Sequence, residues 1–472
     1  MNMANVNLMI NGKALSVPVG TTILEAARAN GIHIPTLCFL KELDPHASCR
    51  MCVVEVEGAR TFQHACAARV REGMVVYTDT EAVRASRKLT LELLLSNHAV
   101  DCHHCLRIGS SRCGDLDPKF CEMCFFCDCV KDGFCELQAL AREYKVDKLP
   151  FEQKHNTLPI DATTAIVRNP NKCIKCKRCV DVCGKVQTVH NLAASGRGCE
   201  ITIGPAFGKP MAESACIGCG RCAEVCPTGA IYAMEHKDEL VYYAHRDGIR
   251  TAAAVSAALI PELERVLHCK PGSVSLPKIV GALRKIGVDT VVDTAEAEEA
   301  ARAQAETLLD EKLGRGKPVI LTNSFAAKAF LEKTFPEKKN SFLFYDSALT
   351  VFGKAAAEYD KRFAFGPVGG DAMECDKTHC VDIAVNAREL ARIMIRTGSE
   401  PHPGRTAEAD TLGLPRFAGH CSRLLGEAAW NMDSEPECFE EHGLRCVICH
   451  NLGQARKALA ETDRYDVIRV IA

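Results

Sequence analysis

Two short stretches decide the fold of this chain: CIKCKRCVDVC at residues 173–183 and CIGCGRCAEVCP at residues 216–227. Both have the spacing C-x2-C-x2-C-x3-C, and the second run begins 43 residues after the first. Thiols at this spacing are typical ligands of a redox-active metal cluster. The repeated run therefore predicts a small domain that holds two such centres.

The two runs resemble the bacterial two-cluster ferredoxins, in which the fourth Cys of each run binds the cluster of the other run. The resemblance implies two [4Fe–4S] clusters with crossed ligands. One cluster would take Cys173, Cys176, Cys179 and Cys226, and the other would take Cys183, Cys216, Cys219 and Cys222. Pro227 ends the second run as that family expects, and we assign no role to Cys199. This ferredoxin domain is expected over residues 151–240.

Composition limits the class of protein. With 472 residues the chain is too long for one domain, and its 47% hydrophobic content is that of a globular protein. Its 28 clustered cysteines favour metal ligation over disulfides. A net charge of −2 and a single Trp, Trp430, give no case for nucleic acid. We found no signal peptide and no apolar run of bilayer length, and therefore expect a cytoplasmic protein with no membrane partner.

Residues 1–80 are expected to form the first domain. VNLMINGKALSVPVG alternates around Asn11–Gly12, which predicts a β-hairpin. TTILEAARANG predicts a short helix with Thr21 as N-cap and Gly31 at C′. The cysteines that follow are Cys38, Cys49, Cys52 and Cys66. Their spacing resembles the plant-type ferredoxin domain of complex I and of multi-cluster hydrogenases, which implies a β-grasp fold with one [2Fe–2S] cluster; a structural zinc site is the alternative.

Residues 81–150 are expected to hold a second kind of cluster. SRKLTLELLLSNHAVDC predicts a helix that ends at His98. His98-x3-Cys102-x2-Cys105, with CELQALAREY downstream, resembles the His-ligated [4Fe–4S] motif of the complex I iron–sulfur subunit. That family's last ligand would fall at Ser111, but the family's ending reappears at Cys135. The resemblance implies the ligands His98, Cys102, Cys105 and Cys135, with Cys129 as an alternative.

The departure from that family indicates a Cys-rich insertion at about residues 106–129. Its further thiols are Cys113, Cys121, Cys124 and Cys127. Three interpretations stay open: an extra [4Fe–4S] cluster, a structural zinc ion, or unligated thiols. Zinc would only brace the loop because it is redox-inert, whereas a cluster would add a branch to the line of redox centres.

Residues 241–472 resemble the catalytic domain of iron-only hydrogenases through KIVGALRKIGVDTVVDT, VNARELARIM and CVICHNLGQARKALAETDRYDVIRVIA, in the family's order. That domain binds its active-site cluster, the H-cluster, through three Cys motifs. The first should follow strand KPVIL, where this chain has Thr322-Asn323-Ser324-Phe325. FGPVGGDAMEC, residues 365–375, stands in place of the second, and the sequence ends at Ala472 where the third should follow. We therefore expect a degenerate α/β domain without an H-cluster.

Local patterns add detail to this last domain. KPVILTNSFAAKAFLEKTF predicts strand then helix, LRCVICHNLGQARKALAETDRYDVIRVIA predicts strand–turn–helix–strand, and residues 253–267 have the pattern of a core helix. Gly453 alone is too weak a signal for a nucleotide site. The remaining thiols and imidazoles could form a replacement metal site: Cys375, His379, Cys380, Cys421, Cys438, Cys446, Cys449 and His450. We favour buried thiols, because Cys446 and Cys449 on one strand would point to opposite faces.

The resemblance as a whole implies an iron–sulfur electron-transfer subunit of a multi-subunit, electron-bifurcating, NAD(H)- and ferredoxin-linked oxidoreductase. Implied partners are a flavin- and NAD-binding diaphorase subunit, a small thioredoxin-like [2Fe–2S] subunit and a separate catalytic subunit; ferredoxin is a further candidate. A nickel–iron hydrogenase is the first choice for the catalytic subunit, and a formate dehydrogenase or another low-potential reductase the second. Two other hypotheses are an active iron-only hydrogenase and a non-catalytic sensor or assembly protein. We expect no catalytic residue and no flavin or nucleotide site in this chain.

Overall fold

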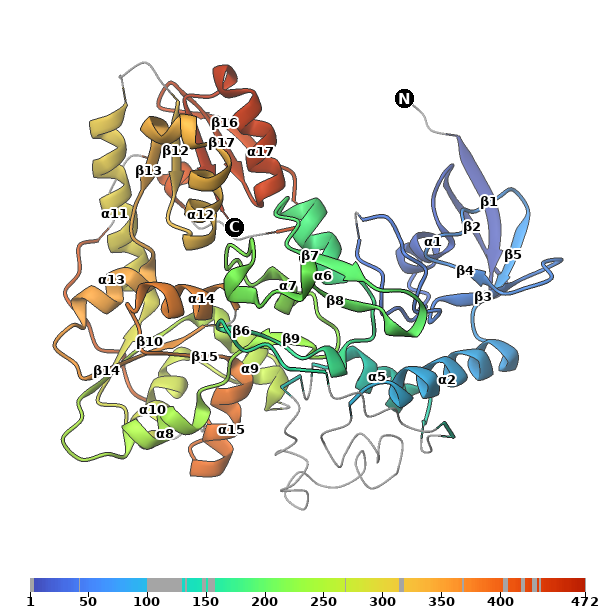
Figure 1. Cartoon of the computed structure of the whole chain (residues 1–472), viewed down its shortest axis with the longest axis horizontal. Helices are drawn as coiled ribbons and strands as arrows, with labels where there is room; N and C mark the ends of the chain where they lie inside the picture. Colours follow the sequence, from blue (N-terminus) through green and yellow to red (C-terminus); the bar gives the residue numbers. More distant parts are fainter. Residues whose placement is uncertain are drawn as a thin grey trace.

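In the computed structural model of the chain, the described residues are 4–41, 43–99, 130–131, 134–146, 150–151, 158–267, 269–313, 318–366, 369–401, 406–416, 421–426, 431–432 and 434–471. Within them the chain passes from an N-terminal sheet domain, through a central region of short elements, to two α/β lobes (Figure 1). None of the helices in these ranges is long and apolar enough to cross a bilayer.

The N-terminal domain is a mixed five-stranded sheet with one helix against it. The strand order is β2-β1-β5-β3-β4, with β1 (Asn5–Ile10), β2 (Lys13–Pro18), β3 (Val53–Val56), β4 (Gln63–His64) and β5 (Met74–Tyr77). The predicted hairpin is confirmed, because Asn11 and Gly12 have φ of 50° and 80°, as a two-residue turn between β1 and β2 requires. Ile10 and Val76 are buried with α1 (Ile23–Ala29) in one core.

The cap of α1 corrects one prediction. Thr22, and not Thr21, is the N-cap: its hydroxyl accepts from Glu25 N–H at 3.2 Å, and the Glu25 carboxylate accepts from Thr22 N–H at 2.8 Å. This capping box satisfies two backbone donors at once. Thr21 instead donates its hydroxyl to the Pro18 carbonyl at 2.7 Å. The other end is as predicted, since Gly31 follows the C-cap with φ 71°.

The central region begins with α2 (Glu81–Ser96) and α5 (Glu136–Glu143), which pack together. Arg87 of α2 is buried, and its guanidinium donates to the Tyr144 hydroxyl at 2.9 Å and to the Val53 carbonyl at 2.7 Å. Two antiparallel strand pairs then frame two short helices: β6 (Ile166–Arg168) with β9 (Ile231–Ala233), β7 (Leu192–Ser195) with β8 (Thr202–Pro205), α6 (Arg178–Asp181) and α7 (Arg221–Glu224). A π-helix, Val182–Val186, continues α6.

The first lobe is a parallel sheet with helices on both faces, the arrangement that covers the apolar side chains of buried parallel strands. The strand order is β11-β10-β14-β15, with β10 (Thr251–Val255), β11 (Thr290–Asp293), β14 (Lys361–Phe365) and β15 (Ile383–Val385). One face carries α8 (Lys237–Ala244), α9 (Ile260–Val266), α10 (Leu276–Ile286) and α15 (Ala387–Thr397). The other carries α11 (Thr294–Lys312), α13 (Ala348–Ala355) and α14 (Gly369–Thr378).

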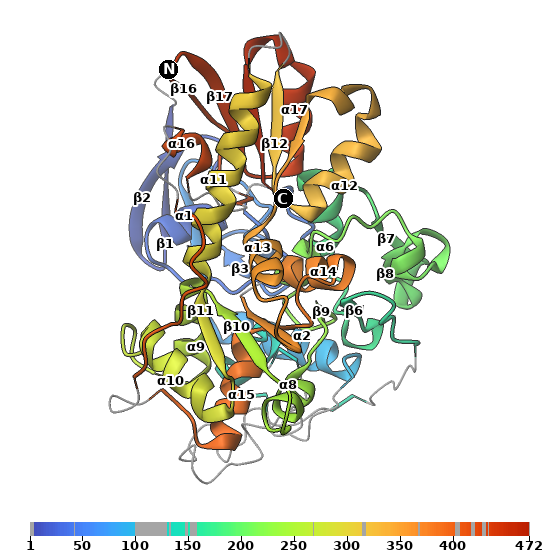
Figure 2. The same ribbon diagram turned by 90° about the vertical axis from the view of Figure 1, so that its left-hand side faces the viewer.

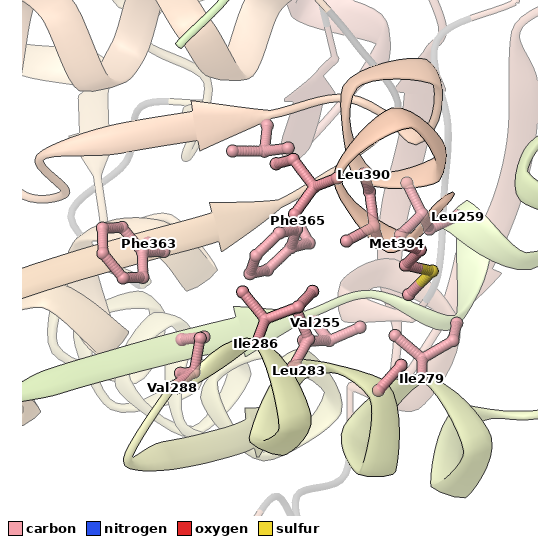
Figure 3. Packing of buried hydrophobic residues seen from close by; sticks show 14 of the residues in the cluster. Val255, Leu259, Ile279, Leu283, Ile286, Val288, Phe363, Phe365, Leu390 and Met394 are labelled. Carbon is pink, nitrogen blue, oxygen red and sulfur yellow. The ribbon is translucent and has the colours of Figure 1, made fainter. Parts of the chain in front are cut away.

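Figure 3 shows the core on the α10–α15 face of this lobe. Phe363 and Phe365 of β14 belong to this core: Phe365 lies near Val255 and Leu390, and Phe363 lies farther along the sheet, on the side of Val288. All five side chains are buried. Because burial of a large apolar side chain contributes about 1.5–3 kcal/mol, this cluster is the main stabilising element of the lobe.

The second lobe is a mainly parallel sheet in the order β13-β12-β18-β17-β16, with β16 antiparallel to β17. Its elements are β12 (Val319–Thr322), α12 (Phe325–Thr334), β13 (Phe342–Phe344), α16 (Ser422–Leu425), β16 (Glu437–Glu441), β17 (Leu444–Cys449), α17 (Leu452–Ala460) and β18 (Val467–Val470). The predicted strand–helix and strand–turn–helix–strand units are thus confirmed. Helix α11 runs along both lobes and joins them (Figure 2).

One element prediction in the lobes is half wrong. Residues 253–255, taken as the start of a core helix, finish strand β10, and helix begins only at residues 257–260. Ser256 makes the break, because its hydroxyl accepts from Ala258 N–H at 3.2 Å and caps the helical segment. A short run of alanines has no periodicity that separates a buried strand from a buried helix.

Two glycines provide a matched test of packing in the first lobe. Gly287 ends α10 with φ 106°, and a Cβ there would lie 2.4 Å from the Ala244 carbonyl oxygen of α8. Gly248 also has positive φ, 81°, but a Cβ there would meet nothing within 4 Å. We expect Gly248→Ala to cost about 1 kcal/mol from backbone strain alone, and Gly287→Ala at least twice as much. Thermal unfolding of the two variants checks this, and equal shifts would contradict the α8–α10 contact.

Candidate metal-cluster sites

The stretch of sequence between α1 and β5 of the N-terminal domain brings four buried cysteines together. They are Cys38, Cys49, Cys52 and Cys66. The Cys52 and Cys66 sulfurs are 3.3 Å apart and share a hydrogen bond. Cys49 donates its thiol hydrogen to Cys38. The negative charge of the Cys38 thiolate lies close enough to Cys52 and Cys66 to act on the pKa of both thiols. The four thiols therefore form one compact group.

Hydrogen bonding prepares these thiols for ionisation. The thiol of Cys49, with the backbone N–H groups of Ser48 and Cys49, lowers the pKa of Cys38 to about 5. The Cys66 thiol likewise lowers the pKa of Cys52. Burial and the donated hydrogen bonds raise the pKa of the partner thiols Cys49 and Cys66. Each pair thus offers a thiolate, the form of Cys that binds metals.

The loop around these thiols has an unusual backbone. Ala47 and Arg50, on either side of Ser48 and Cys49, have φ of 50° and 55°. Non-glycine residues in this left-handed region cost about 1–2 kcal/mol each, and such strain is concentrated at functional sites. The loop is bent so that backbone N–H groups point toward sulfur: Met51 and Leu37 both donate to Cys49.

The two C-x2-C-x2-C-x3-C runs enclose two separate cavities in the central region. The first cavity is lined by Cys173, Cys176, Cys179 and Cys226, and the second by Cys183, Cys216, Cys219 and Cys222. In each cavity the fourth thiol comes from the other run. The structure thus brings together the two crossed sets of thiols that the resemblance to two-cluster ferredoxins implies.

The two runs repeat the same backbone geometry. Lys175 and Gly218, each two residues after the first Cys of its run, have φ of 58° and 75°. Their N–H groups donate to Cys173 and Cys216 at 3.4 Å in both cases. The next left-handed residue in each run, Lys177 or Gly220, begins α6 or α7. This conformation places three thiols of each run in the lining of one cavity.

Burial determines whether the thiols that line these cavities can ionise. Burial raises the pKa of Cys173 to about 11 and those of Cys176 and Cys219 to about 12. Four buried thiols therefore stay neutral unless a cationic group compensates the thiolates. An iron–sulfur cluster supplies iron(II/III) cations for four thiolates, so the donor set of each cavity fits a [4Fe–4S] cluster.

His98 and Cys135 lie beside the first cavity. His98 is buried, and its Nδ1 is 3.0 Å from the carbonyl oxygen of Lys172, which precedes Cys173. A hydrogen bond from Nδ1–H to a carbonyl leaves Nε2 as the nitrogen that can bind metal. Cys135 is also buried, and the Glu136 N–H donates to the Pro227 carbonyl at 2.9 Å, next to Cys226. The other predicted thiols lie outside the described residues: Cys102, Cys105, Cys113, Cys121, Cys124, Cys127 and Cys129.

The sites follow one another through shared cores. One core contains Cys38 and Cys49 of the N-terminal group together with Cys135 and Cys176. A second core contains thiols of both cavities, including Cys179 and Cys222. A third joins Ile217 and Cys219 of the second cavity to α12, α17 and the strands of the second lobe. Neighbouring sites along this line are therefore connected by buried apolar side chains.

Polar contacts between distant segments hold this line together, and the motifs gave no sign of them. Arg178 of α6 is almost fully buried and forms a two-pronged ion pair with Glu136 at 2.6 and 2.8 Å. His46, in the N-terminal thiol loop, is 2.5 Å from Asp181 of α6. Asp181 also pairs with Lys185 at 3.4 Å. The Arg178–Glu136 and His46–Asp181 pairs join residues far apart in sequence, so only the folded chain reveals them.

Gln187 connects the second cavity to the second lobe. It lines that cavity, is fully buried, and its Oε1 accepts from Leu452 N–H of α17 at 3.0 Å. Among the described residues, Nε2 of Gln187 has no hydrogen-bond partner. Gly453 lets α17 approach, since a Cβ there would lie 2.6 Å from the Val186 carbonyl oxygen. Close packing therefore explains this glycine.

The C-terminal thiols are mostly buried, as expected. Cys446 and Cys449 lie on β17 in two different cores, on opposite faces of the sheet. Cys438 is a correction, because it is exposed on the edge strand β16, and Cys380 is partly exposed. Within the ranges that the structure describes, no three His, Cys, Asp or Glu side chains converge as ligands of a single metal ion.

Comparison with known families agrees with this architecture. Residues 3–81 match the 2Fe-2S iron-sulfur cluster binding domain, residues 212–232 the 4Fe-4S binding domain, and residues 249–420 the iron only hydrogenase large subunit, C-terminal domain. The fold and the cysteine sites thus define an iron–sulfur protein that also contains an iron-hydrogenase-type α/β domain.

Curated relatives narrow the class. The chain is 34% identical over 432 residues to the NADP-reducing hydrogenase subunit HndD of Solidesulfovibrio fructosivorans, covering 84% of this chain and 69% of HndD. It therefore belongs to the HndD-type family of iron-only hydrogenase-like iron–sulfur subunits. It is also 34% identical over 235 residues, 49% of this chain, to an NADH-quinone oxidoreductase subunit of Rhizobium meliloti, but spans only 24% of that protein.

Solved structures similar to this chain include two kinds of hydrogenase. The NAD+-reducing [NiFe]-hydrogenase in the H2-reduced state has a chain with 29% identity and a TM-score of 0.40, covering 48% of this chain and 87% of that one. An apo [FeFe]-hydrogenase from Chlamydomonas reinhardtii has 15% identity and a TM-score of 0.40, covering 51% of this chain and 82% of that one.

Gln187 yields a prediction about the second cavity. An N–H donor directed at a cluster sulfur raises the midpoint potential, because it stabilises the more negative reduced state. We expect Gln187→Leu to lower the potential of one [4Fe–4S] cluster by about 20–60 mV, the equivalent of one hydrogen bond. Gln187→Glu keeps the oxygen that accepts from Leu452 but removes the donor, so it should lower the potential as well. EPR-monitored redox titration measures both, and unchanged potentials would assign Gln187 to packing alone.

Proposed function

We propose that this chain is the electron-transfer subunit of a multi-subunit, NAD(P)-linked oxidoreductase. The observation that carries the proposal is the unbroken series of thiol sites, each sharing a buried core with the next, from the N-terminal domain to the second lobe. Clusters strung along a line in this way pass single electrons. Both curated relatives named above are oxidoreductase subunits, which supports the same function.

In this proposal each thiol group holds one cluster. A [2Fe–2S] cluster binds to Cys38, Cys49, Cys52 and Cys66, and two [4Fe–4S] clusters bind to the first and second cavities. A third [4Fe–4S] cluster binds His98, Cys102, Cys105 and Cys135. His98 and Cys135 are anchored to Lys172 and Pro227, so this cluster would lie at the end of the first cavity that faces the [2Fe–2S] site.

The electron path follows from the shared cores. Electrons would pass between the [2Fe–2S] site and the first cavity through the core that contains Cys38, Cys135 and Cys176. They would then cross to the second cavity where Cys179 and Cys222 lie in one buried core. The first and last sites are therefore the points at which partner subunits must deliver and collect electrons.

We further propose that the H-cluster is lost. Ser324, at one expected cluster-ligand position, caps α12 by accepting from Ala327 N–H at 3.3 Å. Phe325 follows it, and Met373 occupies the segment of the second lost motif. A Cβ placed on Gly218, between two thiols of the second cavity, would lie 3.0 Å from Met373 Cε and 3.5 Å from Phe325 Cε1. Apolar side chains thus pack against the second cavity where the family places metal ligands.

The proposal assigns the missing chemistry to partners. A flavin- and NAD(P)-binding subunit would exchange electrons at one end, together with a small thioredoxin-like [2Fe–2S] subunit, and ferredoxin is a further electron carrier. A nickel–iron hydrogenase is the first candidate for the catalytic subunit. The relative HndD is named as a hydrogenase subunit, and a chain of this family without an H-cluster would need another subunit to react with hydrogen. A formate dehydrogenase or another low-potential reductase is the second candidate.

Metal content tests the cluster assignment. After anaerobic purification at full occupancy, we expect about 14 iron atoms per chain from one [2Fe–2S] and three [4Fe–4S] clusters. One additional zinc would make the insertion a structural brace, and about 18 iron atoms without zinc would add a fourth [4Fe–4S] cluster there. Iron well below about 14, with acid-labile sulfide reduced in proportion, would contradict the assignment.

Hydrogen chemistry tests the loss of the H-cluster. Produced together with the maturation enzymes of iron-only hydrogenases, the chain should show no infrared bands of bound carbon monoxide or cyanide. It should also show no hydrogen-dependent reduction of a viologen dye. Either signal would overturn the proposed loss.

A cluster-ligand variant tests the electron path. In the isolated complex, Cys216→Ala should abolish electron transfer between hydrogen or formate and NAD(P)+, while dye reduction by NAD(P)H at the diaphorase subunit continues. Exposed Cys269→Ala is the matched control and should change neither activity. A loss in both variants would sink the proposed path.

A further inference from the structure

Two thiols in the first lobe form a pair that the electron path does not use. Cys375 lies in the last turn of α14, and Cys380 follows a tight turn at His379, whose φ is 52°. The turn is closed by a hydrogen bond from His379 N–H to the Cys375 carbonyl at 3.0 Å. The Cys375 side chain hydrogen-bonds to the Cys380 sulfur. The chain thus holds the two sulfurs in contact across this turn.

Further donors surround the Cys380 sulfur. The Thr378 hydroxyl donates to it at 3.0 Å, and the Thr350 hydroxyl of α13 and the backbone N–H of Val381 add to this shell. With the Cys375 thiol as the largest contributor, these donors lower the pKa of Cys380 to about 6. The nearby charged groups include Glu374 on α14, whose carboxylate competes with Cys380 for the single hydrogen of the Thr350 hydroxyl, and the ion pair between Arg362 and Asp382 across β14 and β15.

The two thiols differ in access. Cys380 is partly exposed, whereas Cys375 is buried with an exposed fraction of 6%. An accessible, readily ionised thiol beside a buried second thiol is the arrangement of redox-active dithiols, in which one sulfur attacks and the other resolves. The buried pair Cys421 and Cys446 provides the contrast, because burial raises their pKa values to about 11 and about 12.

We propose that Cys375 and Cys380 form a redox-active dithiol that a low-molecular-weight disulfide oxidises. The Cys380 thiolate attacks one sulfur of the disulfide, whose S–S bond breaks and releases one thiolate that takes up a proton. Cys375 then loses its proton and attacks the Cys380 sulfur, expelling the second small thiol. Two protein thiols become one disulfide, and the small disulfide is reduced to two thiols.

The position of the pair allows its oxidation state to affect the second cavity. Helix α14, which carries Cys375, also carries Met373, whose Cε would lie 3.0 Å from a Cβ on Gly218 between Cys216 and Cys219. Burial raises the pKa of the Cys216 thiol, and the positive charge of Lys377, on the same turn as Cys375, acts in the opposite direction. A disulfide would fix the end of α14 to the Cys380 loop, so oxidation would alter the packing against this cavity. This consequence rests on the proposed cluster, but the dithiol itself does not.

The test uses the full chain with its clusters, kept anaerobic and exposed to oxidised glutathione. Trypsin cleaves after Lys377, so a Cys375–Cys380 disulfide keeps two peptides joined, and mass spectrometry detects the link. In Cys375→Ser, Cys380 should be trapped as a mixed disulfide with glutathione, and in Cys380→Ser, Cys375 should remain unmodified. Exposed Cys269 is the internal reference for unspecific oxidation.

The pH profile gives an independent readout. Iodoacetamide labelling of Cys380 should reach half its maximal rate near pH 6, in contrast to about pH 8.5 for an ordinary thiol. Labelling near pH 8.5 together with glutathione modification no faster than at Cys269 would overturn the proposal, as would a zinc ion bound at the pair. A linked peptide with no change in the EPR signals would support the dithiol and reject only its action on the cluster.

Discussion

The central region depends on the bonds between its thiols and the groups they bind. Its core combines cysteine side chains, among them Cys179 and Cys222, with apolar side chains such as Ile166, Leu192 and Ile231. Strands β6 to β9 and helices α6 and α7 are only three or four residues long, so regular structure by itself adds little stability here. Because buried thiols without a cation resist ionisation, bound clusters would supply much of the free energy that keeps the two runs folded. The N-terminal domain and the second lobe both pack against this region, so their relative positions depend on it.

Contacts at the edges of this region fix the neighbouring thiol sites relative to one another. The ion pair between Arg178 and Glu136 fixes the segment that carries Cys135 to helix α6, and the contact between His46 and Asp181 fixes the N-terminal thiol loop to the same helix. A single four-residue helix thus touches both neighbours of the first cavity. Partly buried pairs of this kind add little net stability, but they fix geometry. In an electron-transfer protein, the fixed distance between sites matters more than the strength of any one contact.

Much of this architecture could be predicted from the sequence, because the informative patterns are local. The Asn11–Gly12 turn and the strand before Ser324 follow from residue type and spacing. The crossed thiols of the two runs follow from the resemblance of these runs to two-cluster ferredoxins. The N-cap at Thr22 was missed because two adjacent threonines are equivalent until the chain turns. Gln187 and the Cys375–Cys380 pair were missed for a different reason: their roles come from neighbours brought close by folding or by an unusual turn.

If the iron-hydrogenase-type domain has lost its H-cluster, as we propose, packing explains how the domain could still be retained. If an iron-hydrogenase domain lost its H-cluster and nothing filled the space, a polar cavity would remain next to the second cavity. Water in that space would reach the cluster proposed for the second cavity and would allow side reactions there. In this chain Phe325 and Met373 pack on Gly218. Filling this space with apolar side chains would keep the second cavity dry and retain the lobe as a support. Under the proposed function, a domain without chemistry of its own would thus remain necessary, because a cluster in the second cavity would need a rigid apolar wall.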